Sequence, residues 1–163
     1  MSRKMWSSTS YDSGGYQPVR PIYAIRPGGS GDISLPAGNT SNDNIVWSVD
    51  RDGPYISTLL LYRNVIYSLN NNGVLNTFYA LTGERLYRGR VGPGGAYSAS
   101  PIAADGRIYF ANEDGQVYVV RAGKDYVQIV VNEMAEPITA TPAVSDGLMV
   151  IRTTKAVYGI GSK

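Results

Sequence analysis

The feature that most constrains this chain is a short pattern that occurs three times, at intervals of 41 and 42 residues. Its clearest copy is YSASPIAADGRIYFANEDGQVYVVRAG, residues 97–123, in which Asp105-Gly106 and Asp114-Gly115 separate three strand-sized apolar runs. Asp-Gly between such runs predicts a hairpin, because both residues tolerate the positive φ of a two-residue primed turn. The other copies are YISTLLLYRNVIYSLNNNGVL at residues 55–75 and ITATPAVSDGLMVI at residues 138–151. The residues that recur in register are Tyr55/Tyr97, Asn70/Asn112, Gly73/Gly115, Ala99/Ala140, Pro101/Pro142, Asp105/Asp146 and Gly106/Gly147.

A repeat of roughly 40–45 residues built from short strands is typical of a four-stranded propeller blade. The predicted fold class is therefore all-β: a partial β-propeller of about three and a half four-stranded antiparallel blades. We expect one domain, residues 1–163, with a partial blade over 1–52, complete blades over 53–92 and 93–134, and an incomplete blade over 135–163. No window shows a sustained helical period, so we expect about 14 strands and minimal helix.

The apolar runs between turns define the expected strands. Several of them, such as Leu148–Ile151, are apolar on both faces, which fits sheets covered on both sides. Residues 28–44 are rich in Gly, Ser and Asn and predict a long loop. The expected strands are Met5–Tyr11, Ile22–Arg26, Ile45–Val49, Tyr55–Tyr62, Val65–Leu69, Val74–Ala80, Arg85–Val91, Ala99–Ala104, Arg107–Ala111, Gln116–Arg121, Tyr126–Val131, Ile138–Ser145, Leu148–Thr153 and Val157–Ile160.

The composition excludes several classes of function. The chain has no cysteine and no histidine, which removes disulfides, thiolate metal sites and a Ser/His/Asp arrangement. The net charge of +2 and the absence of a basic cluster give no nucleic-acid footprint. No apolar run is long enough to span a membrane, and the first residues lack the apolar core of a secretory signal. We expect a soluble protein whose compartment the sequence does not encode.

Some loops have the composition of ligand sites but lack the required spacing. The glycine-rich segments at residues 28–31 and 92–95 have neither the Gly-Lys-Ser/Thr ending nor the following helix of a phosphate loop. The segments at residues 70–73 and 112–115 resemble calcium loops, but the position of the bidentate glutamate is held by Tyr79 or Arg121. We therefore predict plain turns, with no metal and no cofactor.

The phrases SASPIAADGRIYFANEDGQVYVV and TATPAVSDGLMVIRT resemble the repeats of the pyrroloquinoline-quinone-like (PQQ-like) β-propeller family. The resemblance covers residues 5–161 and is strongest to the carboxy-terminal half of such proteins. The family's docking motif, Ala-x-Asp-x-x-Thr-Gly-x-x-x-Trp, has its best counterpart at residues 77–87, where Thr82 and Gly83 are kept. Thr77, Tyr79 and Tyr87 stand at the Ala, Asp and Trp positions. The resemblance also implies a periplasmic or extracellular parent.

The resemblance implies the scaffold of this family but argues against its quinone chemistry. In the family's dehydrogenases the cofactor lies between a stacked Trp and a vicinal disulfide, with Ca²⁺ held by acidic side chains. This chain has no Cys, and its two tryptophans, Trp6 and Trp47, fall at a predicted second-strand and a predicted outer-strand position.

We therefore expect a non-catalytic structural or interaction module that presents a protein or small-ligand face at the blade ends. Two alternatives remain open: a fragment of a quinoprotein oxidoreductase, and a carbohydrate-binding module that uses some of the 13 tyrosines. More often such tyrosines are ordinary strand residues. The residues expected on the face are Tyr55, Ser57, Tyr97, Ser98, Glu113 and Asp114.

Three and a half blades do not close a ring, so the end blades would each expose an apolar face. We expect Ile22, Ile25, Val150 and Val157 on these faces. The prediction is a homodimer that completes a ring of about eight blades, with the competing possibility that the chain needs the missing other half of its propeller.

Overall fold

The structure is a computed structural model that describes residues 5–7 and 20–161, which form fourteen strands and no helix. The strands are β1 (Met5–Ser7), β2 (Ile22–Ile25), β3 (Ile45–Val49), β4 (Leu60–Tyr62), β5 (Val65–Leu69), β6 (Val74–Tyr79), β7 (Arg85–Arg90), β8 (Ile102–Ala104), β9 (Arg107–Ala111), β10 (Gln116–Arg121), β11 (Gln128–Glu133), β12 (Ala143–Ser145), β13 (Leu148–Arg152) and β14 (Val157–Gly161). The predicted strand number and all-β class are confirmed.

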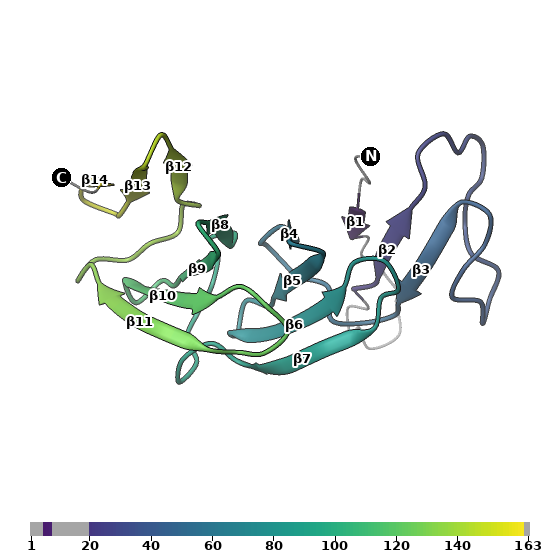
Figure 1. Cartoon of the computed structure of the whole chain (residues 1–163), viewed down its shortest axis with the longest axis horizontal. Helices are drawn as coiled ribbons and strands as arrows, with labels where there is room; N and C mark the ends of the chain where they lie inside the picture. Colours follow the sequence, from purple (N-terminus) through teal and green to yellow (C-terminus); the bar gives the residue numbers. More distant parts are fainter. Residues whose placement is uncertain (1–4, 8–19, 162–163) are drawn as a thin grey trace, which may run out of the picture.

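The strands form four antiparallel sheets, here called the first (β1–β3), second (β4–β7), third (β8–β11) and last (β12–β14). Within each sheet the strands follow one another in chain order. Figure 1 shows the sheets side by side along an arc, with β4, β8 and β12 on its concave side and β7 and β11 along its convex side. This arrangement is the predicted partial propeller.

Two-residue primed turns set the register of the central hairpins. Asp105 and Gly106 have φ of 48° and 72°, and Asp146 and Gly147 have φ of 49° and 77°. Two consecutive positive φ values match the right-handed twist of the flanking strands. The predicted primed turns at Asp105-Gly106 and Asp146-Gly147 are confirmed, and the equivalent turn of the second sheet is made by Arg63 and Asn64 at φ of 50° and 63°. The prediction is wrong for Asp114-Gly115, because β9 and β10 are joined by the longer loop of residues 112–115, in which only Gly115 has a positive φ, 85°.

The innermost strands are shorter than the sequence predicts. They begin at Leu60, Ile102 and Ala143, several residues later than the expected starts at Tyr55, Ala99 and Ile138. Among the residues before them, the amides of Thr58, Tyr97 and Ser100 donate to groups of neighbouring sheets. For example, the Tyr97 amide donates to the carbonyl oxygen of Asn71 at 2.9 Å. The prolines at 101 and 142 also have no N–H to donate to a ladder.

The sheets pack face to face, because their strands carry apolar side chains on both faces. Between the second and third sheets the buried core includes Tyr67, Leu75, Phe110 and Tyr118. Between the first and second sheets it includes Ile22, Trp47, Ile66 and Phe78. The expectation that Ile22 lies on a bare end face is therefore wrong, because this side chain points toward the second sheet and is fully buried.

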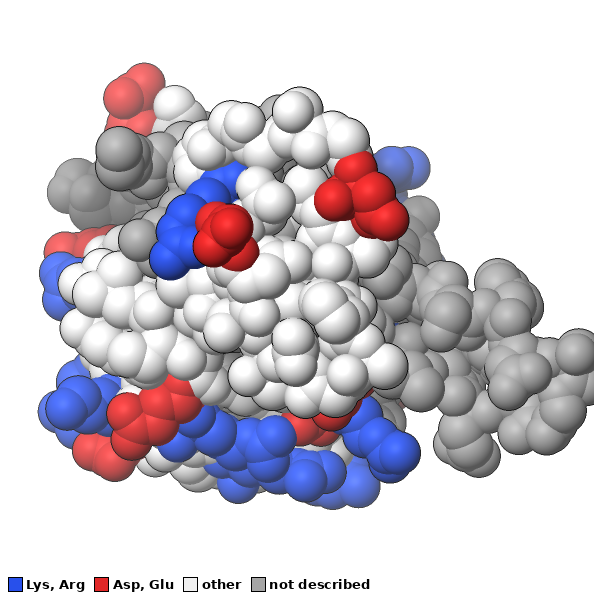
Figure 2. All heavy atoms as spheres, turned by 90° about the vertical axis from the view of Figure 1, so that its right-hand side faces the viewer, with Lys and Arg blue, Asp and Glu red and all other residues white. Residues whose placement is uncertain are grey.

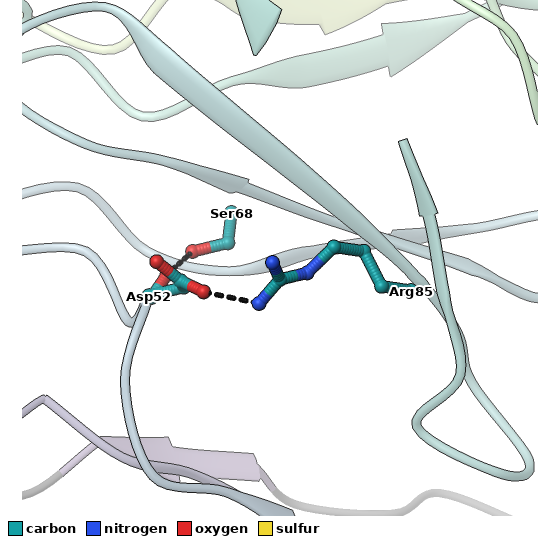
Figure 3. A network of polar contacts seen from close by, with 3 residues as sticks. All are labelled: Asp52, Ser68 and Arg85. Atoms are coloured by element: carbon teal, nitrogen blue, oxygen red, sulfur yellow. Dashed lines mark hydrogen bonds and ion pairs between the residues drawn. The ribbon is translucent and has the colours of Figure 1, made fainter. Parts of the chain in front are cut away.

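The crossing from the first sheet to the second is held by polar contacts to Asp52. The backbone oxygen of Asp52 accepts a hydrogen bond from Ser68 Oγ at 2.6 Å, and its carboxylate forms an ion pair with Arg85 (Figure 3). The next residue, Gly53, donates its N–H to the Arg20 carbonyl at 2.8 Å, and a Cβ there would lie 2.7 Å from that oxygen. The crossing therefore needs a residue without a side chain at position 53.

The outer strands carry equivalent docking positions, which are identified by their bulges. Each outer strand pairs with the strand before it, and the register of this pairing shifts at one place. The shift comes directly after Ala24 of β2, Thr77 of β6 and Val119 of β10. The residues opposite these three are Trp47, Tyr87 and Val130, here called the docking residues. A docking residue points toward the following sheet, so it can fix the position of its neighbour.

Trp47 docks on the turn that precedes β7. Its Nε1 donates to the Ala80 carbonyl at 3.0 Å, and a Cβ on Gly83 would lie 2.6 Å from its Cδ2 atom. Tyr87 instead stacks on Tyr126 of the third sheet, with ring centroids 5.6 Å apart. The Thr-Gly turn noted in the sequence is therefore the receiving surface for the tryptophan of the preceding sheet.

We predict that the Trp47 contact is a main determinant of stability. Trp47→Ala is expected to lower the free energy of unfolding by about 3–5 kcal/mol through loss of a large buried side chain. Trp47→Phe is expected to cost about 1–3 kcal/mol, because the Ala80 carbonyl loses its donor. Urea denaturation measures both. The control is Ser48→Ala on the adjacent residue of β3, which is expected to cost no more than about 1 kcal/mol. Equal effects of Trp47→Ala and Ser48→Ala would contradict the assignment.

Candidate binding surfaces

The structure places the six residues of the expected ligand face in three different environments. Tyr55 is 60% exposed, and the Arg20 guanidinium carbon lies 4.7 Å from its ring centroid. Ser98 donates its hydroxyl to Glu113, and exposed Asp114 follows in the same turn. The structure therefore brings Ser98, Glu113 and Asp114 together at one end of the third sheet.

The other two residues do not belong to an accessible face. Tyr97 is 1% exposed and donates its hydroxyl to the Val91 carbonyl at 3.0 Å. Ser57 is buried and donates to the Leu69 carbonyl at 2.9 Å. Both hydroxyls satisfy carbonyls at the crossings between strands, as buried polar groups must. This corrects the expected face at two of its six positions, and ligand binding by the remaining four stays a prediction.

A chain of hydroxyl groups links three consecutive sheets near their inner strands, and the sequence analysis did not identify it. Thr58 Oγ1 lies 2.7 Å from Ser100 Oγ, which also accepts from the Thr58 amide at 2.9 Å. The Ser100 amide in turn donates to Thr141 Oγ1 at 3.0 Å. The three residues are separated by 42 and 41 positions, so the repeat interval was the signal that could have found them. They fix the spacing of the inner strands.

Burial raises the pKa of several tyrosines above the ordinary value. The largest effect is on Tyr97, whose phenolate would have to form in the core between the second and third sheets. Burial also raises the pKa of Tyr67, Tyr118 and Tyr126. Tyr67 accepts a hydrogen bond from the Gly123 amide at 2.9 Å, so its oxygen joins the second sheet to the third. These tyrosines stabilise the packing between sheets as neutral side chains.

The last sheet exposes apolar side chains on both of its faces. Leu148 and Val157 lie on the face directed away from the third sheet, as their pairing register shows, and Val157 is 67% exposed. Val150 shares this face and is half-buried. Apolar groups gathered at one place on a surface commonly mark an interaction site.

On its other face the last sheet leaves a cavity of about 640 Å³ against the third sheet. Tyr109, Val117 and Met134 line it from the third sheet, and Met149 and Ile160 line it from the last. The buried core beside the cavity is built partly from Ala99 and Ala111, whose small side chains leave the sheets less completely packed than those before them. The size is within the range of ligand pockets, roughly 300–1,000 Å³.

The described ranges contain no group of three carboxylates placed to hold a metal ion. Residues 5–7 and 20–161 likewise include no helix with the length and apolar character needed to cross a bilayer.

The long loop between β2 and β3 is organised by Asn42, whose side chain accepts from the amides of Asn44 and Ile45 at 2.9 and 2.7 Å.

No protein-family model and no curated protein matches the sequence. Solved structures do match its fold. BamB from Moraxella catarrhalis, a PQQ-like β-propeller, has a TM-score of 0.62 at 14% identity, over 94% of this chain and 45% of BamB. The computationally designed Ika8 protein has a TM-score of 0.63 at 15% identity, over 98% of this chain and 44% of Ika8. A chain in the complex of BBS1N with ARL6DN has a TM-score of 0.60 at 14% identity, over 94% and 48% of the two chains.

These likenesses show that the chain has the β-propeller fold and agree with the resemblance of its repeats to the PQQ-like family. The chain spans less than half the length of BamB, Ika8 and the chain from the BBS1N complex.

The raised pKa of buried Tyr97 predicts an alkaline loss of stability. An unfolded tyrosine releases its proton near pH 10, whereas the folded protein holds it to higher pH. Stability from this group is therefore complete below about pH 10 and is lost as the pH rises through the folded pKa. We expect Tyr97→Phe to lower the slope of unfolding free energy against pH by up to about 1.4 kcal/mol per pH unit above pH 10. Urea denaturation from pH 8 to 11 measures it.

At pH 8 the same variant is expected to lose about 1 kcal/mol, because the Val91 carbonyl loses its donor. A Tyr97→Phe protein that keeps the full alkaline slope would show that this hydroxyl is not the titrating group.

Proposed function

We propose that the chain is a non-catalytic β-propeller scaffold that acts by presenting sheet faces and loops to other polypeptides. The single observation that supports this most directly is the exposed apolar face of the last sheet, with Val157 and Leu148 open to solvent. In the rest of the arc, equivalent faces are covered by the next sheet. A scaffold that continues by contact with a neighbour accounts for this bare face.

We further propose that the neighbour is a second copy of the chain. Each copy corresponds to 45% of BamB and 44% of Ika8, so two copies approach the length of those chains. A two-fold axis would place the last sheet of each copy against the first sheet of the other. In this closed arrangement both end faces of each copy are covered, so no end face is left to bind a further copy.

The end face of the first sheet suits this role. Ile22 and Ala24 point toward the second sheet, so the alternation of β2 directs Tyr23 and Ile25 to the opposite face, where both are half-buried. The described side chains on this end of the molecule are largely uncharged, and Lys and Arg gather along its lower margin (Figure 2). An uncharged centre with charges at the rim is the usual composition of a protein interface.

The dimer is tested by light scattering coupled to size exclusion. We expect a mass of about 35 kDa, twice the 17.6 kDa of one chain. Val157→Asp places a charge on the end face and is expected to shift the mass to that of the monomer. The matched control is Ile129→Asp on β11, an exposed apolar residue away from both end faces, which is expected to remain dimeric. A monomeric unmodified chain would overturn the proposal of self-association.

The quinoprotein alternative has a separate test. Trp47 is occupied by its contact with Ala80 and Gly83, so it is unavailable to stack on an axial quinone. We expect the chain with added pyrroloquinoline quinone and Ca²⁺ to give no shift in quinone absorbance and no reduction of an artificial electron acceptor with alcohol or sugar substrates. Acceptor reduction above the level of free quinone and Ca²⁺ would contradict the non-catalytic assignment.

A further inference from the structure

The last sheet has an open edge where its three predecessors have a partner strand. The third-position strands β2, β6 and β10 pair outward with β3, β7 and β11. β14 occupies the same position, because it pairs with β13 as β10 pairs with β9. Among residues 5–7 and 20–161, no segment pairs with its other edge.

The register of β14 follows from this equivalence. Arg107 and Leu148 each follow an Asp-Gly turn, and their partners are Arg121 and Gly161. Aligning Gly161 of β14 with Arg121 of β10 makes Val157 equivalent to Val117, and Tyr158 equivalent to Tyr118. In the third sheet the outer strand places Val131 opposite Tyr118. A strand added to β14 would therefore place one residue opposite Tyr158, on the face toward the third sheet.

A second, independent observation marks the same corner. The docking residues Trp47 and Tyr87 are covered by groups that directly precede the outer strand of the following sheet, Ala80–Gly83 and Tyr126. The third docking residue, Val130, is 44% exposed. The cover it lacks is the segment that would lead into an outer strand beside β14.

We propose that β14 accepts an extended strand from outside residues 5–7 and 20–161, which completes the last sheet. The donor would run antiparallel to β14, as β11 runs against β10. Its main chain would pair with β14, and its apolar side chain opposite Tyr158 would enter the cavity between the third and last sheets. Met134 and Met149 line that cavity, and their flexible side chains can adjust to different apolar groups.

The charges near β14 specify one end of the donor. Arg152 and Lys155 are exposed next to the start of β14, and neither forms an ion pair within the part of the chain that the structure describes. In an antiparallel pair this end faces the carboxyl end of the added strand. The third sheet follows the same pattern, because β11 ends in Glu133 opposite Gln116. The expected donor is therefore an extended segment with an apolar centre and an acidic carboxyl end.

The strand plan argues against a folded second copy as the donor. Each strand in the described ranges already belongs to one of the four sheets, so such a copy has no described strand to release. The edge of β14 is also distinct from the end face used in the proposed dimer. The inference therefore goes beyond that dimer and stands or falls separately.

The probe is a synthetic peptide with the sequence of residues 125–134, DYVQIVVNEM, which contains β11 and its acidic end. Hydrogen exchange of the 163-residue chain is followed by NMR with and without the peptide. We expect the amides of residues 157–161 that face the open edge to exchange at least about tenfold more slowly with the peptide, since pairing protects them. A peptide with proline in place of the residue corresponding to Val130 is expected to give no protection.

Two variants of the chain locate the site. Ile160→Lys, on β14 and facing the cavity, is expected to weaken peptide binding at least about tenfold, because charge on an edge strand opposes pairing. Ala143→Lys, on β12 at the opposite edge of the same sheet, is expected to leave binding unchanged. The thermal melting of both variants is compared with that of the unmodified chain. Leu148→Asp, which places a charge on the same end face but lies on β13, tests strand binding in the absence of the dimer.

Three results would overturn the proposal. The first is that the edge amides of β14 exchange as slowly as those of β10 before peptide is added, which would show that the edge is already paired. The second is no protection of β14 at millimolar peptide. The third is equal loss of binding in Ala143→Lys and Ile160→Lys. If Leu148→Asp is monomeric and still binds the peptide, strand acceptance holds whether or not the chain dimerises.

Discussion

The structure depends on face-to-face packing between successive sheets. A strand such as β5 is buried along its whole length, with Ile66 packed toward the first sheet and Tyr67 toward the third. A sheet with two apolar faces needs a neighbour on each side, so no sheet of this chain can be stable alone. The hairpin turns fix each sheet internally, but the position of each sheet comes from the side chains that cross to the next one.

These crossing contacts change in kind along the chain. Trp47 makes both an apolar contact and a hydrogen bond to the second sheet, Tyr87 makes a ring stack on the third, and Val130 is partly exposed. The core itself changes from large aromatic and aliphatic groups to one that contains Ala99 and Ala111. The end of the arc is therefore the part with the least buried apolar contact. Regions of low packing are where binding can change the structure at the smallest cost in stability.

The sequence predicted well those features that are set locally. The repeat interval, the turns at Asp105-Gly106 and Asp146-Gly147 and the strand number depend on residues within one hairpin, and each is present in the structure. The candidate face was predicted less well. Tyr97 and Ser57 are residue types that are often found on an accessible polar surface. Their orientation depends on hydrogen bonds to the carbonyls of Val91 and Leu69, which come close to them only in the folded protein. The inward orientation of Ile22 depends in the same way on contact with the second sheet.

The composition of β14 bears on how an open edge can exist without indiscriminate association. An exposed edge strand normally pairs with any compatible strand, which leads to aggregation. β14 contains Gly159 and Gly161, and glycine lowers the intrinsic preference for extended pairing because it loses more conformational freedom and offers no side chain to pack. Main-chain hydrogen bonds alone are then a weak basis for pairing at this edge. A partner must add apolar contacts in the cavity beside Ile160 and charge contacts near Lys155, and these side-chain requirements would separate a specific donor strand from an arbitrary one.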